Sequence, residues 1–516
     1  MDFKLNREEI TTSEVIFDGS QEQAVELDYV LPDYYPEIFK IVKCITTPKI
    51  VSYCINGDKL NYELSVCLRI MYCSEQSNTL QVLDQKLNYT KTVELGRAGT
   101  KPKVCIIPKT DYINCRAVNQ RRVDVRGAIS IKLNVTDICN RNVISDAFGM
   151  NIQLRKKPVT YPTNKLFTTK RATITDEFDL GVSKPSVMSI IRSDAVITST
   201  DKKVIANKLV AKGEILISML YTCMKDSVDG IESMQFTLPF SQIIELEGID
   251  ERFDCIVDAD VLSCDLNPKS DGYNESKVID CTAMLLISVS AQMLSTVDIA
   301  TDQFSTQYQT ESQTSDIKVE LSPKYIACSQ VIKGAVDYKD GELDCIYDVW
   351  CNLNGYTTKI DAAGKQAIIN GNAIYTVFAR NSDGAPVVME KEEPFEISVS
   401  CDSITDNSVA DLKIMPVTCS YNLTSNSTVE AKVEIKVSGI ISNNIYMNAL
   451  TDIIVNENAP VEKDGDYALR LYFAEAKEDL WEIAKKYCTS INAIMEENNL
   501  ADDIIAEQGM ILIPIV

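Results

Sequence analysis

Hydrophobic and polar residues alternate along most of the chain, and a spacing of two is typical of strands that bury one face. The segment "KGEILISMLYTC" (residues 212–223) carries apolar side chains at alternate positions. The segment "LPFSQIIELEG" (238–248) follows it after a polar stretch. Together they predict two antiparallel strands joined by a hairpin.

This pair of strands occurs three times along the chain. The segments "NGNAIYTVFAR" (370–380) and "EPFEISVSC" (393–401) repeat it, and Pro394-Phe395 matches Pro239-Phe240 of the first example. A more divergent copy consists of "NYELSVCLRIMYC" (61–73) and "KLNYTKTVEL" (86–95), where Tyr89 takes the aromatic position. A long alternating strand closes each copy; these strands lie at residues 121–135, 276–290 and 427–439.

The copies are spaced by roughly 150 residues, which suits a complete domain and is too long for one unit of a solenoid. We therefore predict a mainly β protein with three repeated antiparallel, sandwich-like domains. Their predicted bounds are residues 1–150, 151–311 and 312–455. Residues 456–466 ("NENAPVEKDGD") have no hydrophobic period and contain Pro and Gly, so a linker is predicted there.

Proline-containing segments precede the first two copies, at residues 28–44 ("DYVLPDYYPEIFKIVKC") and 179–195 ("DLGVSKPSVMSIIRSDA"). The Ile-x-x-Ile spacing after the prolines predicts a turn followed by one short helix. Such a segment fits a structural cap over the sheet edge. The aromatic and acidic side chains of "PDYYPEI" also suit docking of a partner, so both interpretations stay open.

The pattern changes in the last part of the chain, residues 467–516. After a short strand, apolar residues follow a helical spacing from Leu480 to Tyr487. A second helix with the same spacing runs from Ile491 to Asn498, and Thr489 or Ser490 can cap it. The final "GMILIPIV" completes a small βααβ module.

The charge of the chain narrows the choice of partners. Its 516 residues carry 51 basic and 74 acidic side chains, a net charge of −23. Nucleic-acid phosphates and anionic lipid surfaces are bound through Lys and Arg, so this excess of carboxylates argues against both. A basic patch on a partner protein fits such a surface better. Unpaired edges of the repeated β-domains also offer a route to self-association.

The sequence contains no histidine. This excludes Ser-His-Asp and Cys-His nucleophile pairs, His-ligated zinc and an imidazole proton shuttle. The fragment "IDAAGKQ" has Lys359 and Gln366 where a phosphate-binding loop needs a glycine and a hydroxyl. A carboxylate pair for glycoside hydrolysis stays open on composition alone. We expect no enzyme activity, no catalytic residue, no metal and no cofactor.

Seventeen cysteines are scattered singly, without a Cys-x-x-Cys motif. This arrangement indicates reduced thiols rather than a disulfide framework or a zinc site. The stretch "MDFKLNREEITTSEVIFDGS" has charged residues where a signal peptide needs an apolar core. No run approaches the roughly 18 apolar residues of a membrane span. We therefore expect the protein to stay on the side of the membrane where it is made.

The C-terminal module resembles a LysM domain. The residues that carry the resemblance are Leu480-Trp481, Ile483-Ala484, Tyr487, Ile494, Asn498, Gly509 and Leu512-Ile513-Pro514. LysM domains usually bind N-acetylglucosamine polymers such as peptidoglycan or chitin. The family's Gly-Asp-Thr/Ser before the Leu-Trp pair is Lys477-Glu478-Asp479 here, so the glycine and the hydroxyl of the glycan-contacting loop are missing. The added negative charge and the loss of the tight turn argue against glycan binding.

The whole chain resembles a second family. Repeated β-domains with "LPDYYPEI" and Pro-Phe strand pairs, followed by a LysM-like module, are similar to the SPOCS-domain spore coat morphogenetic proteins of the SipL type in spore-forming clostridia. The resemblance implies a non-enzymatic scaffold in the mother cell cytoplasm that helps to localise the coat to the forespore surface. It also implies that the LysM domain binds the basement-layer coat ATPase instead of a glycan. The expected lack of an export signal and the altered sugar loop agree with this.

Two loops of the module form the candidate partner-binding site. A LysM-like fold places residues 477–480 and 504–509 on the two sides of one groove, where apolar anchors carry most of the binding energy. The candidate residues are Lys477, Asp479, Leu480, Trp481, Asn498, Ile504, Ile505 and Gly509. For Trp481, packing in the core and contact with a partner both stay open. The alternative function is a peptidoglycan-binding or peptidoglycan-hydrolysing protein that uses the module for glycan targeting.

Overall fold

The computed structural model describes residues 3–74, 80–100, 102–225, 228–270, 276–462 and 468–515. Over these residues, eighteen long strands form six three-stranded sheets, and two short strands form a seventh sheet. All strand pairs are antiparallel. The prediction of a mainly β protein with repeated antiparallel domains and a C-terminal βααβ module is confirmed.

Each repeat has six strands with the same topology. The first and fifth strands flank the sixth in one sheet, and the second, third and fourth form a meander. The first repeat contains β1 (Lys4–Val30), β2 (Ile38–Asn56), β3 (Lys59–Ser74), β4 (Leu80–Glu94), β5 (Pro102–Asn119) and β6 (Arg122–Phe148). The second contains β7 (Ile152–Asp179), β8 (Val187–Ile205), β9 (Lys208–Lys225), β10 (Val228–Glu245), β11 (Asp254–Lys269) and β12 (Val278–Ser305). The third contains β13 (Tyr308–Asp337), β14 (Leu343–Asp361), β15 (Gln366–Asn381), β16 (Pro386–Ser400), β17 (Ser408–Ser425) and β18 (Thr428–Pro460).

The two sheets of each repeat share one apolar core, because alternate side chains of the facing strands point inward. The Pro-Phe signature has a packing role in these sandwiches. Phe240 lies opposite Gly213, and Phe395 lies opposite Gly371. A Cβ placed on these glycines would lie 2.7 Å and 2.8 Å from the rings, so each ring fills the space beside its glycine.

The predicted short helices at residues 28–44 and 179–195 are wrong. Both segments pass through a turn into strands, β2 and β8. Each of these strands, like β14, begins with two closely spaced β-bulges; these lie at Ile38/Lys40 and Ile41/Lys43, at Val187/Ser189 and Ile190/Arg192, and at Leu343/Cys345 and Ile346/Asp348. Each bulge adds one residue, so core-facing side chains such as Ile38 and Ile41 fall three positions apart. This spacing imitates a helix in the sequence.

The "PDYYPEI" turn closes one end of the first sandwich. Leu31 and Ile38 on its two sides are buried, and their N–H groups donate to carbonyls of the β5–β6 hairpin. The hydroxyl of Tyr72 donates to the carbonyl of Pro36 at 3.1 Å. These contacts give the segment the structural role of a cap. The docking interpretation stays a prediction for Tyr34, whose side chain is 80% exposed.

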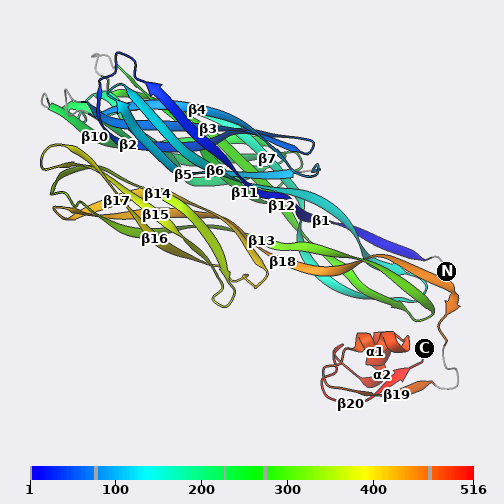
Figure 1. The fold of residues 1–516 in the computed structure, drawn as a ribbon. Helices are drawn as coiled ribbons and strands as arrows, with labels where there is room; N and C mark the ends of the chain where they lie inside the picture. The colour runs from blue at the N-terminus through cyan, green and yellow to red at the C-terminus, as the bar shows by residue number, and fades with distance from the viewer. Residues whose placement is uncertain are drawn as a thin grey trace.

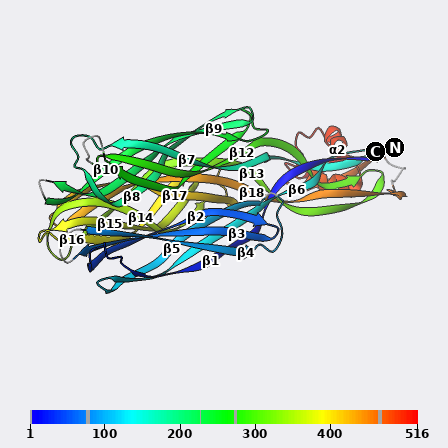
Figure 2. The same ribbon diagram turned by 90° about the horizontal axis from the view of Figure 1, so that it is seen from above.

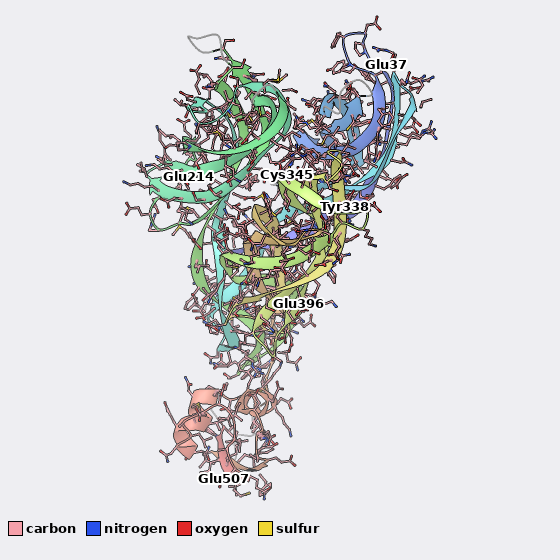
Figure 3. The ribbon with its side chains drawn as sticks, turned by 90° about the vertical axis from the view of Figure 1, so that its left-hand side faces the viewer. Glu37, Glu214, Tyr338, Cys345, Glu396 and Glu507 are labelled. Carbon is pink, nitrogen blue, oxygen red and sulfur yellow. The ribbon has the colours of Figure 1, made fainter. Side chains whose placement is uncertain are left out.

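The three repeats surround a common axis with approximate three-fold symmetry. The fourth strand of each repeat contacts the second strand of the next: β4 contacts β8, β10 contacts β14, and β16 contacts β2. Met71, Leu220 and Phe378 occupy equivalent positions in the three repeats and pack in one apolar cluster. We call this assembly of sandwiches the head; Figure 3 shows its repeats side by side, with Glu37, Glu214 and Glu396 each on a different one.

The first and last strands of each repeat continue beyond the head as two-stranded ribbons. The three ribbons pack together into a narrow stalk (Figure 1, Figure 2). Its core contains residues of all three repeats: Ile10, Val143, Val159, Tyr161, Ile299, Ile317, Val319 and Ala449. The N-terminus and the turns between repeats lie at the far end, which we call the tip, and the βααβ module lies beside it.

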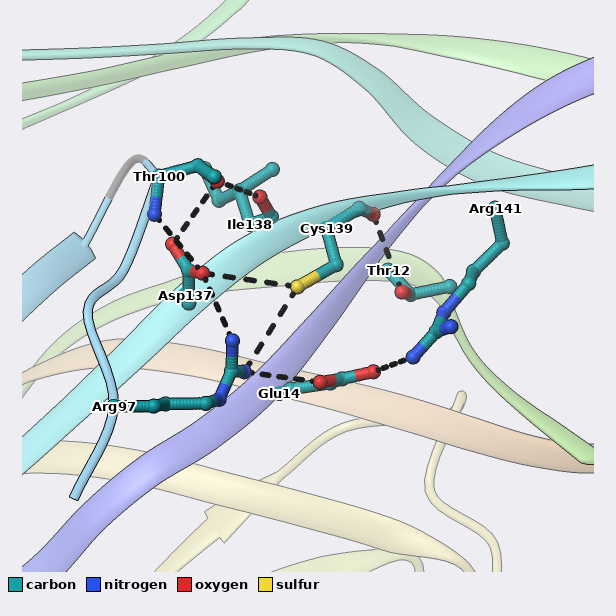
Figure 4. A network of polar contacts seen from close by, with 8 residues as sticks. All are labelled: Thr12, Glu14, Arg97, Thr100, Asp137, Ile138, Cys139 and Arg141. Carbon is teal, nitrogen blue, oxygen red and sulfur yellow. Dashed lines mark hydrogen bonds and ion pairs between the residues drawn. The ribbon is translucent and has the colours of Figure 1, made fainter.

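A buried polar side chain marks the passage from head to stalk in the first repeat. The Asp137 carboxylate accepts the N–H of Thr100 at 3.1 Å and lies 3.5 Å from the Arg97 guanidinium (Figure 4). Both partners belong to the loop between β4 and β5, so Asp137 holds this loop in place. At the equivalent position of the third repeat, Asn443 accepts from Ser408 of β17 and donates to the carbonyl of Ser403, so it holds the loop between β16 and β17.

The structural borders differ from the predicted ones by a few residues. The third repeat begins with β13 at Tyr308, ahead of the predicted border at 311/312. Strand β18 continues to Pro460 because Ile453 and Val455 extend the alternation of core-facing residues. Asn456 and Pro460 of the predicted linker are therefore paired with β13. Residues 463–467, which include the end of that linker, lie outside the described residues.

Candidate partner-binding site

The C-terminal module consists of β19 (Leu469–Ala474), α1 (Leu480–Tyr487), α2 (Ile491–Asn498) and β20 (Gly509–Pro514). The Asp479 side chain caps α1 by accepting the N–H of Trp481 at 2.9 Å. Ser490 caps α2 by accepting the N–H of Ala493 at 3.1 Å. Of the two caps predicted for α2, Ser490 is therefore the one that acts. Among the described residues, no helix is long and apolar enough to span a membrane.

Both helices cover one face of the two-stranded sheet and enclose a small core. The buried residues are Ala474, Leu480, Trp481, Ile483, Ala484, Ile494, Ile505, Ile511 and Ile513. Asn498 joins α2 to the sheet, since its amide accepts the N–H of Leu512 at 2.7 Å and donates to the carbonyl of Leu512 at 2.6 Å. Three candidate residues, Leu480, Asn498 and Ile505, therefore have packing roles.

The two candidate loops lie side by side. The N–H of Lys477 donates to the carbonyl of Ile505 at 2.7 Å, and the N–H of Ile505 donates to the carbonyl of Glu478 at 2.9 Å. Because backbone hydrogen bonds join the loops, their outward side chains share one surface. Lys477 is exposed there, and Ile504 is 55% exposed. Gly509 starts β20 beside them.

The tight turn before α1 is present, so the prediction of its loss is wrong. Lys477 has a φ of +71°, a left-handed conformation that normally favours glycine. The Glu478 carboxylate stabilises the turn by accepting the N–H of Glu475 at 2.9 Å and the hydroxyl of Tyr472 at 2.5 Å. The hydrogen bond to Glu478 raises the pKa of Tyr472 to about 12. Glu478 is thus engaged inside the module.

Trp481 lies between the module core and the stalk, and only 3% of it is exposed. Its ring meets Phe304 of β12 edge to face, with centroids 5.1 Å apart. Its Nε1–H donates to Asp302 at 2.8 Å, and Lys485 donates to the same carboxylate at 2.7 Å. Burial raises the pKa of Asp302, but these hydrogen bonds outweigh burial and hold the pKa below its ordinary value. Core packing is therefore the interpretation that the structure supports for Trp481.

A second ion pair links module and stalk. Arg155 of β7 lies 2.7 Å from Asp479, which therefore both caps α1 and contacts the second repeat. Four residues of this contact were not among the predicted site residues: Arg155, Asp302, Phe304 and Lys485. A signal was present, because Thr301-Asp302-x-Phe304 recurs with small changes at residues 145–148 and 451–454.

The fold defines a protein class with three β-sandwich repeats around a common axis and a small module at the tip of their stalk. Residues 186–269 match the family model for the SPOCS domain of SipL. The match covers the meander and the fifth strand of the second repeat, whereas β7 and β12, which reach into the stalk, lie outside it. The chain therefore carries a SipL-type SPOCS domain, which indicates a protein related to the spore coat. Comparisons with curated proteins and with solved structures gave no match.

Proposed function

We propose that this protein is a non-enzymatic scaffold of the spore coat. It acts in the mother cell cytoplasm, binds the basement-layer coat ATPase through its C-terminal module and helps to localise the coat to the forespore surface. The observation that carries the proposal is the SPOCS match in the second repeat. Three copies of one sandwich, joined into a head and a stalk, suit a scaffold that holds a binding module at a fixed distance.

The chemistry of the module supports a protein partner over a glycan. In the loop that contacts sugars in LysM domains, the carboxylates of Glu478 and Asp479 are engaged by groups within the chain. The side chains that remain exposed, Lys477 and Ile504, offer a cation beside an apolar anchor.

Co-purification from sporulating cells tests the proposal. The full chain should retain the basement-layer ATPase, and a chain that ends at Pro460 should lose it while its repeats stay folded. The single variants Lys477→Glu and Ile504→Arg should each weaken binding by about 30-fold, the effect of losing an anchor worth about 2 kcal/mol. The control Asn492→Arg changes an exposed residue of α2 and should bind normally.

Retention of the ATPase by the shortened chain would contradict the proposal. A pull-down on purified peptidoglycan separates it from the alternative function. Peptidoglycan binding that depends on the module would favour glycan targeting, whereas equal recovery with and without the module supports the protein partner.

A further inference from the structure

A short motif recurs at the tip of each ribbon: Ser145-Asp146, Thr301-Asp302 and Thr451-Asp452. In each copy the hydroxyl donates to a carbonyl of the paired strand, at 3.4, 3.2 and 3.2 Å. Each aspartate accepts the N–H of the residue that follows it, at 3.0, 2.8 and 3.1 Å. A β-bulge lies at each position. The three sites are therefore copies of one local structure.

In two of the three copies, the aspartate pairs with a cation of the next repeat around the axis. Asp146 pairs with Lys156 of the second repeat at 2.8 Å, and Asp452 pairs with Arg7 of the first repeat at 2.7 Å. The corresponding residue of the third repeat, which would serve Asp302, is Thr314. Because threonine carries no charge, Lys485 of the module takes this place, 2.7 Å from Asp302.

The apolar residue near each aspartate also differs between the second repeat and the other two, in its exposure to solvent. Two positions after each aspartate stand Phe148, Phe304 and Ile454. Phe148 is 51% exposed and Ile454 is 46% exposed, but Phe304 is only 5% exposed because Trp481 covers it. The second repeat therefore differs from the other two in the partner of its aspartate and in the cover over its apolar residue.

We propose that the tip of the second repeat is a specific docking socket for the βααβ module of the same chain. The socket consists of Arg155, Asp302 and Phe304, and the module fills it with Asp479, Trp481 and Lys485. The missing cation at Thr314 keeps Asp302 free of the pairing that its two equivalents make within the stalk. Docking fixes the module on the stalk and leaves the Lys477 and Ile504 surface exposed.

Tryptophan fluorescence of the full chain tests the socket without any partner protein. The chain has two tryptophans, Trp350 in the head and Trp481 in the module, so a Trp350→Phe background leaves Trp481 as the reporter. The double variant Asp302→Asn/Phe304→Ala should shift the emission to longer wavelength, because the ring becomes exposed to water. The matched pair Asp146→Asn/Phe148→Ala changes the equivalent site of the first repeat and should leave the emission unchanged.

A second variant restores the symmetry of the stalk. Thr314→Lys places a cation where the first and second repeats have Arg7 and Lys156, and Thr314 is exposed. The new lysine should compete with Lys485 for Asp302 and shift the emission in the same direction, by less than the double variant. Limited proteolysis in the natural Trp350 chain gives an independent readout: cleavage between Pro460 and Leu469 should accelerate at least tenfold in the double variant.

An unchanged emission and an unchanged cleavage rate in Asp302→Asn/Phe304→Ala would overturn the proposal. Equal effects of the matched pair in the first repeat would also overturn it, because they would show a general loss of stalk structure. Emission that moves to shorter wavelength as the protein concentration rises would show docking between two chains and would overturn docking within one chain.

Discussion

The head and the tip each contain a set of three equivalent residues, one from each repeat, but the two sets differ in kind. In the head, the equivalent positions hold Lys43, Arg192 and Asp348. Arg192 pairs with Asp348 at 2.5 Å and lies 4.4 Å above the Trp350 ring. At the tip, the equivalent positions all hold aspartate, and the partners of those aspartates differ instead.

The comparison shows two uses of divergence among internal repeats. In the head, the repeats have diverged so that a cation of one repeat meets an anion of another, which holds the ring of sandwiches together. At the tip, the third repeat has Thr314 in place of a cation, and Asp302 of the second repeat binds the module instead. The head is thus closed on itself, and the tip of the second repeat is specialised for the module.

The largest difference between head and tip should follow the loss of an arginine. Arg192→Ala leaves Asp348 without its cation at a largely buried site and should lower the free energy of unfolding by about 3–5 kcal/mol. Arg7→Ala removes an exposed cation from Asp452 and should cost less than about 1 kcal/mol. Urea denaturation measures both values. Equal losses would mean that the head and tip ion pairs are alike.

Substitutions at the passage between head and stalk should lower the free energy of unfolding by less than Arg192→Ala does. Asp137→Ala removes the carboxylate that holds Thr100, and a hydrogen bond to a charged group contributes about 1.5–3 kcal/mol. Asn443→Ala removes uncharged hydrogen bonds at the equivalent position and should cost about 1 kcal/mol. Hydrogen exchange should show faster opening of the Thr100 amide in Asp137→Ala only. Fast exchange of this amide in the unmodified chain would refute the assigned role.

A smaller effect tests the symmetry of the repeats within the head. Tyr72 and Tyr221 are equivalent, and their hydroxyls donate to the carbonyls of Pro36 and Pro185 at 3.1 and 3.3 Å. Tyr72→Phe and Tyr221→Phe should each cost about 1 kcal/mol, because each removes one part-buried hydrogen bond to the carbonyl of a turn residue. Thermal unfolding of the two variants should give similar shifts. A large effect in only one repeat would contradict their equivalence.

The smallest effect is expected in the turn before α1. At Lys477 the left-handed conformation costs a non-glycine residue about 1–2 kcal/mol, and Lys477→Gly removes this cost. Glycine's greater freedom in the unfolded chain offsets about 0.5–1 kcal/mol of the resulting gain in stability. The module should therefore be stabilised by about 1 kcal/mol or less, as its thermal unfolding would show. The same variant should bind the ATPase more weakly. Destabilisation would contradict the turn geometry.

Much of the fold follows from local patterns in the sequence. Alternating residues predicted the strands of the meanders, and the Pro-Phe pairs predicted the repeats, because both signals act between neighbours in the chain or across a hairpin. The helices predicted at residues 28–44 and 179–195 failed because two bulges change the spacing of core residues such as Ile38 and Ile41 from two to three.

The candidate site was harder to predict, because the stalk and the module meet across a long separation in sequence. Asp302 and Lys485 are 183 residues apart, and no local pattern connects them. The capping role of Asp479 is visible in the sequence, whereas its contact with Arg155 depends on the packing of the module. Repetition of the Ser/Thr-Asp motif marks the tip, and only the structure reveals that Thr314 breaks its symmetry.

A zero-length carbodiimide cross-link between Lys485 and Asp302 tests the docking of the module most directly. This reagent joins an amine to a carboxylate that it already contacts, and the two groups lie 2.7 Å apart. Lys156 and Asp146, 2.8 Å apart at the equivalent site, provide an internal control in the same sample. Mass spectrometry of the monomeric fraction should identify both cross-links. Recovery of the Lys156–Asp146 link without the Lys485–Asp302 link would contradict the docked module.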